Sequence, residues 1–363
     1  MLFFCPLTWF ILLLGISPAA SQIDDDLLFV EQTLKDNHPG FYNDFDPDFP
    51  KFFESNFNTA REKLHCAETD DDKKNVLKEL GRSFEDSHLW VKYDLASPQA
   101  TQTKNYELEK LNETIYWITI PSFYPATEES KDALQQIIHT LPTLREKTLV
   151  FDLRGNRGGS CLWGRELINA LFGEDYVRER LAYLYSHTGS LWRISPDNLK
   201  HMVEQMSHSI KRHMGENHPA TLQFMELNQN IEKAFEQGEA TYFAPVIIEP
   251  SSSQPALNPM KEHIFILIDR NCYSATLMFL DELKAMQAEV TLLGETTGAD
   301  SMYMELRTVD LPSGLGKLGF PIRVYRGPSR GHNVPYHPDI RIMKILQNTE
   351  ELKKMIIRMV EGT

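Results

Sequence analysis

The chain has 363 residues, of which 42% are hydrophobic and 24% are charged, so it can bury at least one complete core. This composition excludes a disordered or collagen-like chain, and the length predicts two domains, or one large domain with an appendage. The formal net charge is −14. Because such a chain repels phosphate backbones, no nucleic-acid partner is expected.

Residues 1–21 contain one apolar run that ends in small residues and is followed at once by acidic ones. This pattern predicts a signal peptide cleaved near residues 19–21, and therefore an exported protein, either periplasmic or secreted. The run has no Lys or Arg in front of it, and an uncleaved N-terminal anchor is the alternative. No later stretch reaches membrane-spanning length, so no stable span is expected after signal removal.

Residues 22–90 are predicted to form an N-terminal helical domain. Apolar residues recur at helical spacing from Leu27 to Leu34, before the breaker His38-Pro39-Gly40, and again from Phe52 to Leu64. Residues 91–363 are predicted to form the second domain.

In this second domain the periodicity changes to that of an α/β core. Runs of β-branched and aromatic residues predict strands at 115–120, 148–153, 264–269 and 290–293. Helical segments separate these strands, so the sheet is predicted to be parallel. Residues of about 175–260 are polar and helical, without strand character until 242–248, and are interpreted as a helical insertion.

A glycine-rich turn follows the predicted strand at 148–153 and opens a helix. Its consecutive Gly158 and Gly159 leave backbone N–H groups bare, which suits an anion or an oxyanion. The glycine spacing fits neither a dinucleotide fingerprint nor a P-loop. A plain tight turn is the alternative.

Ser274 follows the predicted strand at 264–269 and lies at the first turn of a helix. Its hydroxyl and the N–H of Ala275 can therefore project from the sheet edge, as a nucleophile requires, although an ordinary helix N-cap would occupy the same position. A serine nucleophile needs a base. His88, next to the hydroxyl of Ser87, is the candidate, with a structural histidine as the alternative.

No metal or cofactor is expected. The histidines at 201, 208, 213 and 218 are offset by 7, 5 and 5 residues, which matches no ligand pattern, and the chain has no HExxH motif.

Six motifs occur in a fixed order: Asp86-Ser87-His88, 118–123, 149–159, Ser274-Ala275, 294–298 and 337–340. Together they resemble the tail-specific (C-terminal processing) family of serine peptidases, in the branch of the tricorn core protease and the interphotoreceptor retinoid-binding modules. The resemblance implies an α/β fold, with a β-sheet and helix core like that of the crotonase and Clp protease folds, preceded by a helical cap domain.

The same resemblance implies the parts of a catalytic site. Ser274 matches the nucleophile, His88 the general base and Ser87 the residue beside it. Gly158 or Gly159, with the N–H of Ala275, matches the oxyanion hole. The processing branch instead uses a Ser-Lys dyad, which is disfavoured because no Lys follows the motif at 294–298.

Two departures from the family pattern bear on function. The family's supporting Glu falls on His332, so the carboxylate that would orient the base is missing, and a histidine cannot stabilise a neighbouring imidazolium by charge. Only 59 residues separate His88 from Thr148, which leaves no room for a PDZ module.

Two functions are compatible with these residues. The first is an exported serine endopeptidase that cleaves peptides or unfolded segments by acyl transfer through Ser274. The alternative is a non-catalytic binding protein on the same fold, holding an apolar ligand or a peptide. The pair Ser274 and His88 favours the enzyme, whereas His332 favours the binding protein. A homo-oligomer is compatible with either function.

Overall fold

The structure is a computed structural model that describes residues 22–93, 105–249, 257–327, 330–343 and 346–362. The predicted signal peptide, residues 1–21, lies outside the described residues. None of the described helices is long and apolar enough to span a membrane.

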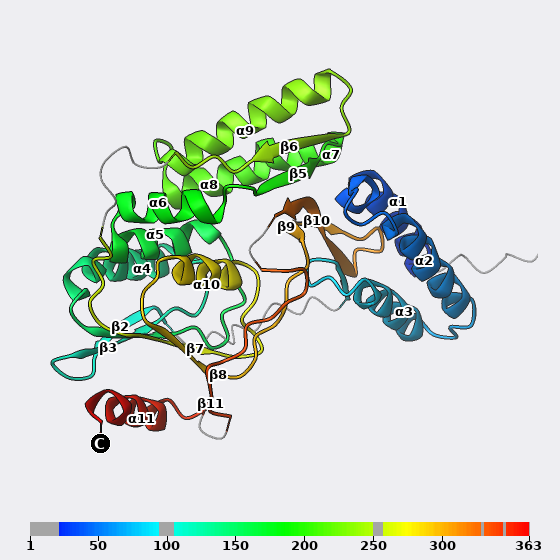
Figure 1. The fold of residues 1–363 in the computed structure, drawn as a ribbon. Helices are drawn as coiled ribbons and strands as arrows, with labels where there is room; N and C mark the ends of the chain where they lie inside the picture. Colours follow the sequence, from blue (N-terminus) through cyan, green and yellow to red (C-terminus); the bar gives the residue numbers. More distant parts are fainter. Residues whose placement is uncertain (1–21, 94–104, 250–256, 328–329, 344–345, 363) are drawn as a thin grey trace, which may run out of the picture.

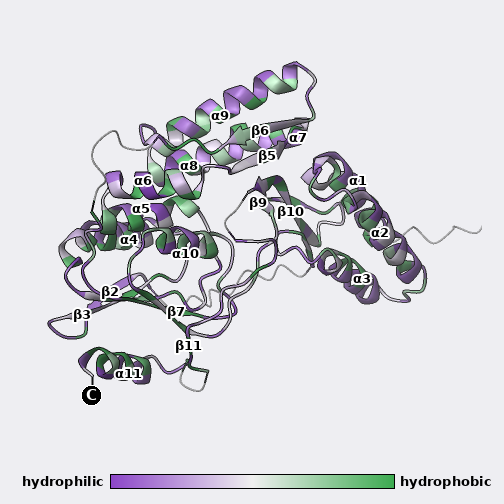
Figure 2. Ribbon diagram, viewed as in Figure 1, coloured by the Kyte–Doolittle hydropathy of each residue, from purple (hydrophilic) through white to green (hydrophobic). Residues whose placement is uncertain are grey.

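Three helices and a short 3-10 helix form the N-terminal region, on one side of the molecule (Figure 1). They are α1 (Gln22–Asn37), η1 (Pro39–Tyr42), α2 (Phe49–His65) and α3 (Asp70–Ser83). Thr69 begins α3 with a capping box to Asp72, and Phe53 and Phe57 are buried one turn apart on α2. Helices of this region alternate hydrophobic and hydrophilic stretches (Figure 2). The N-terminal helical region expected from the sequence is confirmed.

The central sheet has six strands in the order β11-β8-β7-β4-β3-β2. Their bounds are β2 (Glu107–Lys110), β3 (Ile115–Thr119), β4 (Thr148–Asp152), β7 (Ile264–Ile268), β8 (Val290–Gly294) and β11 (Ile340–Arg341). All pairs are parallel except β2 with β3. Every residue of β4 and β7 is buried, and both strands are correspondingly apolar apart from Thr148 and Asp152 at the two ends of β4. The predicted α/β fold is confirmed.

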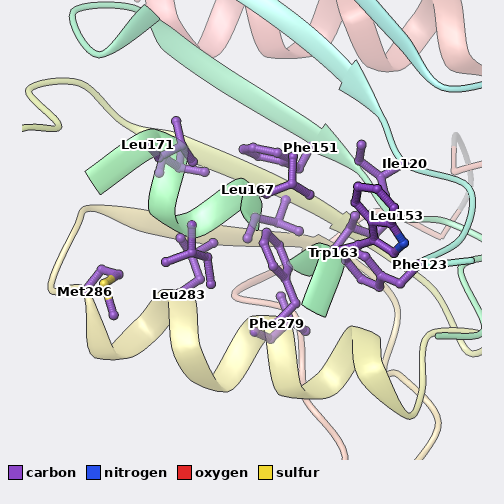
Figure 3. Close-up of a cluster of buried hydrophobic side chains, with 14 of the residues drawn as sticks. Ile120, Phe123, Phe151, Leu153, Trp163, Leu167, Leu171, Phe279, Leu283 and Met286 are labelled. Atoms are coloured by element: carbon purple, nitrogen blue, oxygen red, sulfur yellow. The ribbon is translucent and has the colours of Figure 1, made fainter. Parts of the chain in front are cut away.

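Helices cover both faces of this sheet (Figure 1). One face carries α4 (Glu128–Thr140), α5 (Cys161–Phe172), α6 (Glu174–Leu184) and α10 (Ala275–Ala285), and the other carries α11 (Thr349–Glu361). In Figure 3, Leu167 and Leu171 of α5 lie close to Phe279 and Leu283 of α10, beside Phe151 of β4. The carboxyl ends of β4 and β7 thus lie next to each other above one packed core.

A second sheet joins the N-terminal region to the insertion and to the C-terminal part of the chain. It has the order β1-β10-β5-β6, with β9 paired to β10. Its strands are β1 (Trp90–Tyr93), β5 (Gly189–Arg193), β6 (Thr241–Pro245), β9 (Tyr303–Asp310) and β10 (Gly316–Arg326). Residues directly before β1, which include His88, thereby lie near the carboxyl end of β7 in the central sheet.

The sequence analysis expected the insertion to be helical, without a strand before residue 242. The structure differs from this expectation. The insertion contains α7 (Pro196–Lys200), the π-helix η3 (His201–Met206), α8 (Ser207–Met214) and α9 (Pro219–Glu236), but also strand β5. Five residues are too short to show a clear period. Pairing with β10 on one side and β6 on the other decides the extended conformation of β5.

Candidate active site

Ser274 occupies a strained turn between β7 and α10. Its φ of 59° and ψ of −129° are unusual for a residue with a side chain, and such a conformation costs about 1–3 kcal/mol. It lies at the N-cap position of α10, yet its side chain makes no capping hydrogen bond. The ordinary N-cap interpretation is therefore disfavoured. A strained strand-to-helix turn is how α/β-hydrolases expose their nucleophilic serine.

His88 faces this serine across the junction of the two sheets. Its Nε2 lies 3.3 Å from Ser274 Oγ, although the two residues are 186 positions apart in the sequence. The imidazole is buried, in the turn between α3 and β1. Glu85 begins this turn with a φ of 52°, which folds the chain back before the histidine. The structure thus brings together the serine and the histidine that the sequence singled out.

Asp86 supplies a carboxylate to His88 that the sequence analysis did not assign. Its Oδ1 accepts the backbone N–H of His88 at 2.9 Å and the hydroxyl of Ser301 at 2.9 Å, and lies 3.6 Å from His88 Nδ1. A small rotation of the imidazole would close the last distance to a hydrogen bond. The expectation that the base has no carboxylate beside it is therefore not met, because the carboxylate comes from the histidine's own turn.

Asp300 is a second carboxylate near the same imidazole. It is 1% exposed, and its Oδ1 accepts the hydroxyl of Ser87 at 3.4 Å. Burial raises the pKa of Asp300, against the positive charges of His88 and Arg330 and a hydrogen bond from the backbone of Ser274, which lower it.

These two carboxylates raise the pKa of the His88 imidazole. Burial alone lowers the pKa of this imidazole, but hydrogen bonding and charge from Asp86, with the charges of Asp300 and Glu305, outweigh it. The pKa of His88 is therefore raised above its ordinary value. An imidazolium formed at this position is stabilised by its surroundings.

The glycine turn packs beside the serine. The N–H of Gly158 donates to Asn156 Oδ1 at 2.9 Å, so it is already occupied. Among the described residues, the N–H groups of Gly159 and Ala275 have no protein acceptor. A Cβ on Gly158 would lie 2.8 Å from Ser274 Cβ and 2.9 Å from the nitrogen of Ala275, so this turn packs directly on the serine. Of the two glycines considered, Gly159 has the available donor.

Asn156 holds the turn in place. It is fully buried, its Nδ2 donates to the carbonyl of Ile120, and its Oδ1 accepts from the hydroxyl of Thr276 at 2.8 Å as well as from Gly158. The amide thus links the end of β3, the glycine turn and α10. The sequence analysis missed Asn156. The available signal was its position in the turn after a buried strand, between Gly155 and Gly158.

His332 lies apart from the imidazole it was expected to support. It is exposed, its Nδ1 accepts the N–H of Met302 at 3.1 Å, and its Nε2 lies 3.3 Å from the Asn333 amide. Within the described chain it makes no hydrogen bond to His88 or Ser87.

A hollow of about 190 Å³ lies near the site: Met278, four residues after Ser274, and Asp300 line it, whereas Ser274 and His88 do not. Its apolar lining includes Phe45, Met278, Met302, Met304 and Tyr325, and its polar lining includes Asp281, Asp300, Arg330 and His332. Met278 belongs to the first turn of α10, the helix that Ser274 precedes. Asp300 therefore forms part of the wall between the hollow and His88.

The family model for peptidase family S41 matches residues 114–342, more than half of the chain. The chain belongs to peptidase family S41. It is thus a member of a hydrolase family that acts on peptides, as the sequence motifs implied. The match includes the glycine turn and Ser274, whereas His88 precedes it. A search of curated proteins finds no match for this S41 chain.

Three solved structures are similar to this S41 chain over most of its length. A lipoprotein from Streptococcus agalactiae is 14% identical, with a TM-score of 0.48, over 94% of this chain and 100% of that one. A candidate peptidase from Parabacteroides merdae ATCC 43184 is 16% identical, with a TM-score of 0.46, over 94% and 96%. The tricorn protease is 12% identical, with a TM-score of 0.49, over 93% and 37%. Because these TM-scores are below 0.5, the family assignment rests on the family model.

Proposed function

We propose that the chain is a serine endopeptidase that cleaves peptides or unfolded protein segments by acyl transfer through Ser274. One observation carries the proposal: the serine side chain, in a strained turn and free of any capping role, lies 3.3 Å from Nε2 of the buried His88. Export forms part of the proposal and is supported by the apolar pattern of residues 1–21.

In the first step His88 Nε2 takes the proton of Ser274 Oγ while the oxygen attacks the carbonyl carbon of the scissile peptide. The carbonyl oxygen becomes an oxyanion, which accepts hydrogen bonds from the N–H groups of Gly159 and Ala275. Asp86 and Asp300 stabilise the imidazolium by charge.

The tetrahedral intermediate then collapses. The C–N bond breaks, the leaving amine receives its proton from His88, and the acyl group remains as an ester on Ser274. His88 next takes a proton from a water molecule that attacks this ester. A second collapse releases the new carboxyl end and returns the proton to Ser274.

The hollow near the site can hold the substrate side chain next to the scissile bond. The hollow near the start of α10 has three methionine and two aromatic side chains in its lining, including Met278 and Met304. Flexible thioethers adapt to substrates of different shape. We therefore assign the hollow to a large apolar side chain of the substrate.

A non-catalytic binding protein on this fold would need none of the polar arrangement around Ser274. A buried histidine between two carboxylates, and N–H donors left without an acceptor, cost stability without contributing to the binding of an apolar ligand. These features favour the enzyme.

Labelling with a fluorophosphonate probe tests the proposal. The wild-type protein should form one covalent adduct on Ser274, located by mass spectrometry of a proteolytic digest, and should cleave unfolded casein. Ser274→Ala should lose both, and Ser160→Ala is the matched control because Ser160 caps α5 and should keep both. An unlabelled wild-type protein without peptidase activity would overturn the proposed function.

A further inference from the structure

His38 is a buried histidine whose tautomer is determined by its surroundings. It is 1% exposed and occupies the N-cap of η1, where its Nδ1 accepts the backbone N–H of Gly40 at 3.0 Å. The proton of the neutral ring therefore lies on Nε2. The ring stacks on Phe49, with centroids 4.6 Å apart, and is tilted against Tyr303 at 5.0 Å. Packing on both rings restricts its orientation.

The Nε2–H group of His38 has no hydrogen-bond partner in the described chain, although it is buried. An unpaired buried donor costs about 1–3 kcal/mol, so a native structure rarely keeps one without a reason. Asp86 Oδ2 is buried and unpaired in the same way. The site thus holds an unpaired buried donor and an unpaired buried acceptor, together with Nδ1 of His88 and Oδ2 of Asp300, which are also unpaired among the described residues.

The two groups lie within electrostatic reach of each other. The charge of Asp86 acts on His38, and also on Tyr303, whose ring packs on His38. The backbone connects them as well, because the N–H of Tyr303 donates to Ser301 Oγ, whose hydroxyl donates to Asp86 Oδ1. The other oxygen of Asp86, Oδ2, is the one left without a partner among the described residues.

His38 stays neutral at the pH values at which a serine peptidase works. Burial lowers its pKa to about 4, and Asp86, the charged group that acts on it, only partly opposes this effect. A neutral imidazole donates a hydrogen bond to the carboxylate without adding a positive charge. It therefore leaves the full attraction of Asp86 for the imidazolium of His88.

We propose that His38 is a positioning residue whose Nε2–H is connected to Asp86 Oδ2 through one bound water, and that it thereby orients the carboxylate toward His88. The inference rests on the proposed serine mechanism. It adds His38, from the N-terminal helical region, to the chain of interacting residues Ser274, His88 and Asp86. That region then contributes to catalysis and does not merely cover the core.

Two variants distinguish the role of Nδ1 of His38, which caps η1, from the proposed role of its Nε2. In His38→Asn the side-chain oxygen reproduces the Nδ1 acceptor that caps η1 but cannot reach Asp86. In His38→Gln the longer amide places an N–H group near the position of Nε2. We expect His38→Asn to lower kcat about tenfold, with little change in KM. The acid limb of its kcat/KM profile should move to lower pH, because a misoriented Asp86 raises the pKa of His88 less.

The readouts separate a positioning role from a structural one. His38→Gln should recover most of kcat and the wild-type acid limb, even though it loses the cap. Equal losses of kcat in both variants, or a wild-type profile in His38→Asn, would overturn the inference while leaving Ser274 labelling intact. Loss of labelling in the wild-type protein would instead remove the proposed function itself.

A spectroscopic measurement covers the case in which His38→Asn does not fold. In protein labelled with ¹⁵N-histidine, the Nε2–H proton of His38 should be protected from exchange and should shift when Asp86→Asn is introduced. A signal that Asp86→Asn leaves unchanged would contradict the hydrogen bond.

Discussion

Asp86 precedes His88 by two residues, and the same oxygen of its carboxylate accepts the backbone N–H of His88 at 2.9 Å and lies 3.6 Å from the Nδ1 of the ring. The carboxylate and the imidazole thus belong to one turn of the chain. An acid in this position moves with the histidine, so its orientation depends on local geometry more than on the packing of distant elements. Ser301 donates its hydroxyl to the same oxygen at 2.9 Å, and the proposed donor His38 would bind the other oxygen.

Asp86→Asn should therefore lower kcat strongly, by at least about 100-fold, because an amide neither stabilises the imidazolium nor selects its tautomer. The sign of the pH effect follows from the raised pKa of His88, to which Asp86 contributes most among the groups that raise it. Without that charge the pKa falls. The base stays neutral to lower pH, and the acid limb of kcat/KM moves to lower pH. An unchanged limb would show that Asp86 does not act on His88.

The sequence predicted the central sheet because its parallel strands are buried on both faces and appear as continuous apolar runs. It predicted the pairing of Ser274 with His88 through ordered motifs. It could not predict the part of Asp86, since a carboxylate at i−2 faces the ring only when the turn folds back, as Glu85 makes it do with a positive φ. Strand β5 was missed because its partners, β10 and β6, are distant in the sequence.

Gly158→Ala should abolish turnover and fluorophosphonate labelling. Its φ is 91°, and the new methyl group would lie 2.8 Å from Ser274 Cβ and 2.9 Å from the nitrogen of Ala275. It would therefore displace the serine or fill the oxyanion position. The loss in kcat/KM should be at least about 100-fold, the size of one lost oxyanion donor.

Gly155→Ala is the matched control for this variant. Gly155 lies in the same turn with a φ of 82°, but a Cβ there meets nothing within 4 Å. It should cost about 1 kcal/mol in the free energy of unfolding and keep its labelling. Equal activity in the two folded variants would show that Gly158 does not shape the site. Substitution of Gly159 is less informative, because a Cβ there would lie 2.4 Å from the backbone of Phe123.

Asp300→Asn should make the protein more stable at pH 7 but less active. The pKa of Asp300 is raised mainly by burial, so its favourable contribution is present at low pH and is lost as the pH rises through the folded-state pKa. An ionised carboxylate that is 1% exposed destabilises the fold at neutral pH, and the neutral amide removes that cost.

Thermal unfolding at several pH values checks this prediction. The gain in Tm of Asp300→Asn over the wild type should be present at pH 7 and should shrink below about pH 4, where the carboxyl is protonated in both folded and unfolded chains. A gain of the same size at every pH would point to packing and not to charge.

Substitution of His332 should change little in catalysis. Its ring is exposed and contacts Met302 and Asn333, not His88. Both His332→Ala and His332→Glu should keep kcat within about twofold of the wild type, and any change should fall on KM, because His332 lines the hollow assigned to the substrate. A rise in kcat for His332→Glu alone would show that a carboxylate at this position reaches the imidazolium, and that the loop moves toward His88 in the working enzyme.

Met278→Trp should change the substrate preference without removing the nucleophile. Met278 lies one turn after Ser274 and lines the hollow of about 190 Å³, so an indole there would occupy the space assigned to a large apolar substrate side chain. We expect kcat/KM to fall about tenfold or more for peptides with Leu, Met or Phe before the scissile bond, and to stay nearly constant for those with Ala. Fluorophosphonate labelling of Ser274 should persist, because the small probe does not need the hollow. If both groups of peptides lost activity equally, the hollow would lie outside the path of the substrate, and the preference for large side chains would have to come from another surface near Ser274.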